Sequence, residues 1–214
     1  MKHKIEKNTV QETLILPLYS RKLCTELYPN LYRDETAVHL IDQIDYDFSE
    51  AEKNSRSLMQ RFGALEVAMR QNDLAWEVRD YLKTHPSAAV VFASGVFYYF
   101  LTEQVRELVQ GMAEAFPGGV LVFDAANRTA VKMIAKTWLR TAKIKDVGAY
   151  FAVSDAPKEI GEWDSRLQVS SKGYILGYND LKDPSVSGFF RFLAKVGDNG
   201  MKMQIVKIGF GDRP

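Results

Sequence analysis

The sequence predicts a mixed α/β protein, with a helical N-terminal region over residues 1–86 and a sheet with crossover helices over residues 87–214. Two observations lead to this fold class. Apolar residues recur at helical spacing through the first part of the chain. In the second part, short apolar runs alternate with amphipathic stripes, which is the order of a sheet crossed by helices. Because 46% of the 214 residues are hydrophobic, one core can serve both parts, and we expect one compact unit.

Helical patterns fill the N-terminal region. The first spans Thr9–Leu27, although Pro17 should break or kink it because proline has no backbone N–H to donate. Asp34 is a suitable N-cap for the second helix. A longer amphipathic pattern covers Ser55–Lys83 as one or two helices, and His85–Pro86 ends it. The first part of the chain is therefore a helical layer or cap.

The most apolar run of the chain, Val90–Phe100, is predicted to hold the central strand and the turn that leaves it. The strand covers Ala88–Ala93, which has no polar residue, as is typical of a strand buried on both faces. After a further helix, Val120–Phe123 forms a second buried strand. Functional residues in such sheets lie at the carboxyl ends of the strands, here at positions 93–95 and 124–127.

The last third of the chain continues the alternation of helices and strands. The predicted elements are a helix over Arg128–Arg140, a short helix over Asp155–Trp163, a strand over Leu167–Leu176, a helix from Asp183, and a last strand over Met203–Phe210.

Charge and cysteine content exclude several classes of protein. The net charge is +1, so no field favours a nucleic acid or an anionic membrane. The single cysteine, Cys24, excludes an internal disulfide framework, and His3, His39 and His85 are scattered, so we predict no metal site. Met1–Gln11 lacks the apolar segment of a signal peptide, and no window is apolar enough to span a membrane. We expect a soluble cytoplasmic protein.

Short motifs along nearly the whole chain resemble one enzyme family. They are Glu12–Arg21, Asp45–Phe48, Met69–Asp73, Val78–Leu82, Phe92–Phe100, Phe116–Gly119 and Val122–Ala125. In this order they resemble the leucine carboxyl methyltransferase family, and within it the polyketide O-methyltransferases of the tetracenomycin type. The resemblance implies a Rossmann-like class I methyltransferase that uses S-adenosylmethionine. It also implies transfer of a methyl group to a hydroxyl or carboxyl of a small, polyketide-like molecule.

The sequence departs from this family at the centre of the cofactor site. Family members carry a Gly-x-Gly turn after the first strand and an acidic residue after the second strand, and neither is present here. Val90–Val91, at the expected end of the first strand, runs directly into Phe92–Ala93, which matches the fourth strand. Two strand–helix–strand units of about 30 residues each would be missing. Natural shortening and an omitted internal segment both remain open.

The resemblance assigns four residues to the cofactor. Arg70 matches an arginine that holds the carboxylate of S-adenosylmethionine, and a guanidinium fork suits that group. Arg21 could reach the same amino-acid end, whereas the alternative for both arginines is a solvated helix position. Ser94 and Gly95 lie where the family lines the pocket, although many relatives have an acidic residue at position 94. Their structural alternative is a tight turn that needs small residues.

Three further residues are candidates for contact with the substrate. Tyr98 and Tyr99 could face a substrate pocket, although aromatic residues at the start of a helix are more often part of the core. Asp124 could lie at the rim of the pocket or serve as a turn or N-cap residue. No catalytic residue can be assigned from the sequence.

Two functions follow from these features. The first is an S-adenosylmethionine-dependent O-methyltransferase that acts on a small molecule, but the missing Gly-x-Gly loop leads us to expect no measurable activity from these residues alone. The second is a non-catalytic, shortened methyltransferase-like domain, which forms a homodimer or binds a protein partner through an exposed sheet edge.

Overall fold

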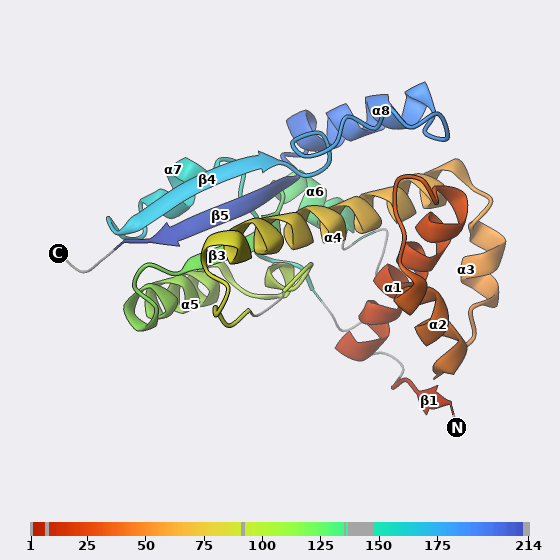
Figure 1. Ribbon diagram of the computed structural model, residues 1–214, viewed down its shortest axis with the longest axis horizontal. Helices are drawn as coiled ribbons and strands as arrows, with labels where there is room; N and C mark the ends of the chain where they lie inside the picture. Colours follow the sequence, from red (N-terminus) through yellow and green to blue (C-terminus); the bar gives the residue numbers. More distant parts are fainter. Residues whose placement is uncertain (1, 7–8, 91–92, 135, 137–147, 212–214) are drawn as a thin grey trace.

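The protein is a mixed α/β structure in which one long helix joins a helical N-terminal region to a small sheet (Figure 1). The computed structural model describes residues 2–6, 9–90, 93–134, 136 and 148–211. Four helices form the N-terminal region: α1 Val10–Leu27, α2 Glu35–Gln43, α3 Ser49–Asn54 and α4 Leu58–Thr84. β1 (His3–Lys4) precedes α1, and β2 (Ile44–Asp45) follows α2. The two short strands pair in parallel over two residues.

The local signals place these helices as the sequence predicts, with one correction. Asp34 caps α2 by accepting the backbone N–H of Ala37 at 2.8 Å, and α4 ends at His85. The predicted break at Pro17 is wrong, because α1 is continuous through this residue. Buried side chains on the face of α1, such as Tyr19 and Leu23, pack against α2 and α4, and this burial outweighs the loss of one backbone hydrogen bond.

In the residues that the structure describes, the second part of the chain alternates helices with three strands. Its elements are the short 3₁₀ helix η1 Phe97–Tyr99, α5 Thr102–Ala115, β3 Val120–Ala125, α6 Arg128–Ile134, α7 Ala156–Gly161, β4 Leu167–Gly173, α8 Gly188–Lys195, the π-helical turn η3 Val196–Gly200 and β5 Gln204–Phe210. The three predicted strands that begin near residues 120, 167 and 203 are confirmed. Of the predicted helix Arg128–Arg140, the part after Ile134 lies almost wholly outside the described residues.

The sheet has the order β3-β5-β4, and β5 runs antiparallel to both neighbours. β3 and β4 are therefore parallel to each other, with β5 inserted between them. The chain from β3 to β4 passes through α6 and α7, so it is a crossover connection of the kind that the sequence predicts.

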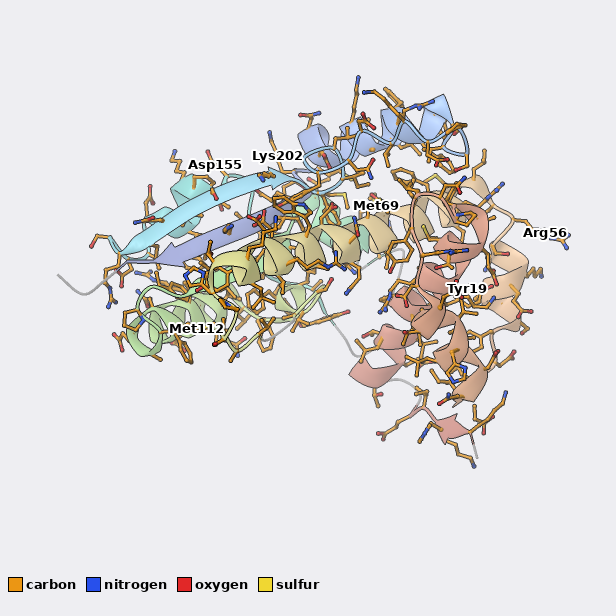
Figure 2. All side chains as sticks on the ribbon, viewed as in Figure 1. Tyr19, Arg56, Met69, Met112, Asp155 and Lys202 are labelled. Carbon is orange, nitrogen blue, oxygen red and sulfur yellow. The ribbon has the colours of Figure 1, made fainter. Side chains whose placement is uncertain are left out.

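The two faces of the sheet differ in chemistry. Phe123, Val206 and Ile208 lie on one face, where they form an apolar core with α5 and α7. The other face meets the C-terminal half of α4 and carries Asp124 and Lys207. A second core, which includes Met69 (labelled in Figure 2), joins α1 and α4 to the segments around β4 and α8, so both predicted parts of the chain share one interior.

The predicted central strand over Ala88–Ala93 is wrong for the residues that the structure describes. Residues 88–90 and Ala93 have no strand geometry, and Val91 and Phe92 lie outside the described residues. Val90 is 46% exposed. An apolar run becomes a buried strand only when neighbouring strands supply hydrogen bonds and a second layer covers it. In this chain, Ala89, Val90 and Ala93 instead line a shallow pocket between α4 and β3.

Candidate functional site

The candidate site is an ion pair between α4 and the carboxyl end of β3. Arg70 lies on the buried side of α4, and its Nη1 is 3.2 Å from Oδ2 of Asp124. Oδ1 of Asp124 accepts the backbone N–H of Gly95 at 2.7 Å. Only 2% of the Asp124 side chain and 13% of the Arg70 side chain are exposed. One carboxylate therefore joins three segments that are far apart in the sequence.

Glycine suits position 95 in this arrangement better than any residue with a side chain. Its φ of +70° lies in the left-handed region that favours glycine. A Cβ at this position would be 3.3 Å from both Nη1 and Nη2 of Arg70. The missing side chain lets the backbone of the loop approach the guanidinium directly. Ser94, the preceding residue, lies half-buried in the same loop.

Two tyrosines complete the surroundings of the guanidinium. The ring centroid of Tyr174, from the turn after β4, is 5.9 Å from Cζ of Arg70, within the range of a cation–π contact. The Tyr98 hydroxyl is buried near Asp124, and it lacks a hydrogen-bond partner among the described residues, as does Nε of Arg70. The site thus contains two buried polar atoms that can still form hydrogen bonds.

The protonation states of the site follow from burial and charge. Burial and the carboxylate of Asp124 raise the pKa of Tyr98, so its hydroxyl stays protonated and can donate. Burial alone would lower the pKa of Arg70, but Tyr174 and Asp124 offset this effect and raise it, so the guanidinium stays charged. Burial also raises the pKa of the Tyr174 hydroxyl.

A cluster of acidic side chains lies along the same face of α4. Glu66 and Asp73 are one turn before and one turn after Arg70, and Asp198 faces them from the π-helical turn. Burial raises the pKa of Glu66 to about 7, and burial together with the charge of Asp198 raises that of Asp73 to about 8. Both carboxylate oxygens of Asp73 are buried without a hydrogen-bond partner in the described structure. Glu66 and Asp73 therefore gain or lose their protons close to neutral pH.

The structure brings together four of the seven residues that the sequence singles out. Arg70, Gly95, Tyr98 and Asp124 lie in one cluster, and Ser94 adjoins it. Tyr99 is in η1 beside Tyr98, and no described hydrogen bond or ion pair joins it to Arg70 or Asp124.

Arg21 lies in a separate ion pair at the start of α2. Its Nε is 2.8 Å from Oδ2 of Asp34, and the other oxygen of Asp34 caps α2. Tyr32 donates its hydroxyl to the same carboxylate at 3.1 Å. Arg21 thus holds the start of α2 against α1, and none of its described polar contacts reaches Arg70.

Sequence reasoning missed Tyr174 and the acidic residues of α4. One signal was available for the latter, because Glu66, Arg70, Asp73 and Glu77 are separated by four, three and four positions and so share one helix face. Polar residues at this spacing are normally read as a solvated face. Tyr174 gives no local signal, because only the turn after β4 brings it to the site.

Comparisons with known proteins add no further assignment, since no protein-family model, no curated protein and no solved structure matches this chain. Within the described residues, no group of three or more histidine, cysteine or acidic side chains is placed to hold a metal ion. None of the helices in the same residues is long and apolar enough to cross a membrane.

Proposed function

We propose that this chain is an S-adenosylmethionine-dependent O-methyltransferase-like protein with a shortened Rossmann-like sheet. In this proposal it keeps the part of the site that binds the amino-acid end of the cofactor and lacks the part that binds adenosine. Its relatives would act on a hydroxyl or carboxyl of a small, polyketide-like molecule. One observation carries the proposal: Arg70, Gly95, Tyr98 and Asp124, taken from separate sequence motifs, form one buried cluster.

The residues of this cluster fit the amino-acid end of S-adenosylmethionine. A buried guanidinium binds a carboxylate well, and Nε of Arg70 has no partner among the described residues. At Gly95 the backbone of the loop, rather than a side chain, faces the guanidinium. The Tyr98 hydroxyl could accept a bond from an ammonium group. Asp124 already neutralises Arg70, so a bound carboxylate would share the guanidinium with it.

The sequence offers no comparable site for the adenosine end of the cofactor. A close approach of the backbone to a nucleoside needs a glycine-rich turn at a strand end, and the only Gly-x-Gly of the chain is Gly209–Gly211, at the end of β5. Charge-assisted hydrogen bonds contribute about 1.5–3 kcal/mol each, whereas micromolar affinity needs about 8 kcal/mol. Contacts at the amino-acid end alone therefore predict millimolar or weaker binding, without methyl transfer.

Titration of S-adenosylmethionine into the folded protein tests this proposal. We expect no heat of binding at micromolar cofactor, and at millimolar cofactor a change of the Gly95 amide shift in NMR spectra. Arg70→Lys should abolish that change because lysine lacks the planar fork. Arg79→Lys, on the exposed side of the same helix, should not alter it. Micromolar binding would contradict the loss of the adenosine site, and no shift at tens of millimolar would contradict the proposal as a whole.

A non-catalytic role through self-association is the second candidate, and the sheet supplies the observation that favours it. β3 is an end strand of the described sheet, and Phe116, four residues before its start, is an exposed apolar residue. An end strand of this kind can pair with another chain. Sedimentation equilibrium should then show a dimer that Val122→Pro abolishes, whereas a monomer at all concentrations would contradict self-association.

A further inference from the structure

A pocket of about 300 Å³ lies where α4 crosses β4 and β5, on the polar face of the sheet. Trp76 and Asp80 of α4 line one wall, and Ser170 and Ser171 of β4 line the other. Its volume is at the lower end of the range for small-molecule sites. The pocket is separate from the Arg70 cluster, and the proposed methyltransferase chemistry does not use it.

Two aromatic rings and one carboxylate meet in this pocket. The ring centroids of Trp76 and Tyr178 are 5.7 Å apart, and their planes are inclined at 66°. Glu77 lies beside them, and only 3% of its side chain is exposed. Its Oε1 accepts the Tyr178 hydroxyl at 2.8 Å, and its Oε2 accepts Nζ of Lys207 at 2.8 Å. Both the carboxylate and the second ring are therefore fixed in position.

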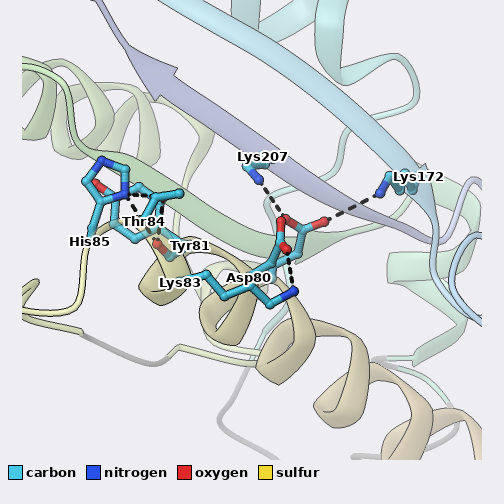
Figure 3. A network of polar contacts seen from close by, with 8 residues as sticks. Asp80, Tyr81, Lys83, Thr84, His85, Lys172 and Lys207 are labelled. Carbon is cyan, nitrogen blue, oxygen red and sulfur yellow. Dashed lines mark hydrogen bonds and ion pairs between the residues drawn. The ribbon is translucent and has the colours of Figure 1, made fainter.

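A cation already occupies the space between the two rings. Nζ of Lys172 is 5.2 Å from the ring centroid of Trp76 and 4.9 Å from that of Tyr178. The same atom is 3.7 Å from Oε1 of Glu77. Figure 3 shows Lys172 and Lys207 reaching from their strands toward α4. Inclined aromatic rings around an ammonium, with a carboxylate behind it, are the arrangement that binds alkylammonium ions.

We propose that Trp76, Tyr178 and Glu77 form a binding site for a quaternary ammonium group, such as that of choline or a trimethylated lysine, and that Lys172 is its intramolecular occupant. This assignment does not depend on the methyltransferase-like function.

The two aromatic faces, rather than the net charge around the pocket, favour a cation over an anion. Lys207 balances the charge of Glu77, so removal of the Lys172 ammonium leaves two π faces and a neutral ion pair. Asp80 at the wall is paired with Lys83, whose Nζ is 3.1 Å from its Oδ1. Burial and Glu77 raise the pKa of Tyr178, so its hydroxyl stays protonated and continues to donate to the carboxylate.

The occupant can leave the site at little cost. About half of the Lys172 side chain is exposed, and its separation from Glu77 is longer than a hydrogen bond. A quaternary ammonium is less strongly hydrated than a primary one, and its methyl groups can touch both rings. Lys172 therefore acts as a tethered competitor that weakens, but does not prevent, binding of an outside cation.

Titration with choline, followed by the fluorescence of the tryptophans and by NMR, tests the proposal on the full chain. 3,3-Dimethylbutan-1-ol, the neutral isostere of choline, is the matched ligand control. We expect the wild-type protein to bind choline and not the isostere. Lys172→Ser should tighten binding about tenfold because the tethered competitor is lost, and Lys172→Gln, which keeps most of the stem, should act in the same direction.

Trp76→Leu should weaken choline binding about tenfold because one π face is lost, whereas Trp163→Leu should leave it unchanged. Thermal melts of each variant confirm that it is folded. Equal binding of choline and the isostere would overturn the proposal, because the pocket would then be merely apolar. The proposal would also be overturned if neither Lys172 variant bound choline more tightly than the wild type. Binding of benzoate or phosphate that is lost in Lys172→Ser would overturn it as well, because the pocket would then be an anion site.

Discussion

The carboxyl group of Asp73 should make the stability of the protein depend on pH, and Asp73→Asn tests this directly. Asp73 is fully buried on α4, and neither of its oxygens has a hydrogen-bond partner in the described residues. Burial and the nearby Asp198 raise its pKa from 3.8 to about 8. Asparagine has nearly the same shape and carries no charge at any pH in this range, so the substitution removes only the ionisation.

The sign and size of the effect follow from proton linkage. The folded state holds the Asp73 proton more tightly than the unfolded state. The contribution of this proton to the free energy of unfolding is therefore fully present below pH 3.8, and it decreases as the pH rises to about 8. Each unit in this window lowers the free energy of unfolding by up to about 1.4 kcal/mol. At pH 7 the wild type would therefore be less stable than Asp73→Asn by as much as about 4 kcal/mol.

Urea denaturation of both proteins between pH 4 and pH 8.5 measures the difference. We expect the two free energies of unfolding to be similar at pH 4 and to separate steadily up to pH 8. Asp80→Asn is the control, because this half-exposed residue of the same helix forms only a surface ion pair with Lys83, whose loss should change the free energy of unfolding by less than about 1 kcal/mol. A constant difference between Asp73→Asn and the wild type across the range would refute the argument.

Three further experiments, on Gly95, Asp124 and Cys24, test the site and the core. Gly95→Ala should destabilise the protein by about 1–3 kcal/mol in thermal melts, because φ is positive at this position and the new Cβ would contact Arg70. Gly111→Ala is the control: it has open space around it in a helix and should stabilise the protein by about 0.5–1 kcal/mol. Asp124→Asn should cost about 3–5 kcal/mol, because Arg70 would keep a buried charge without a counterion; a loss below about 1 kcal/mol would show that the pair is solvated. Burial raises the pKa of Cys24 to about 12, so its thiol should react with a disulfide reagent at pH 8 only in urea, and rapid labelling of the folded protein would contradict its burial.

Local patterns allowed much of the fold to be predicted. Amphipathic spacing, the Asp34 cap and the stop at His85–Pro86 depend on neighbours within one or two turns, so α2 and α4 could be read from the sequence. The apolar strands β3 and β5 pair with each other and are covered by α5 and α7 on one face and by α4 on the other, which matches their composition. Motif resemblance contributed Arg70, Gly95 and Asp124, which no periodicity would have selected.

Features that depend on distant partners could not be predicted. Ala88–Ala93 has the composition of a buried strand, but pairing depends on strands that must come from elsewhere in the chain. Asp73 is a polar residue in an amphipathic helix, where solvent exposure is the usual outcome, and only the fold places it in the interior. Trp76 and Lys172 are about a hundred positions apart, and neither position indicates that the two side chains meet.

The polar residues on the inner face of α4 also determine where this helix lies on the sheet. Arg70 faces Asp124 of β3, and Glu77, two turns later, faces Lys207 of β5. If α4 slid by one turn in one direction, Glu66 would take the position of Arg70 and oppose the carboxylate of Asp124. A slide in the other direction would bring Asp73 or Leu74 to the same place and leave Asp124 buried without a cation. Apolar contacts alone would tolerate such shifts more easily, because they have no direction. We therefore expect the two ion pairs to specify the register of α4, the best-attested role of buried charged groups.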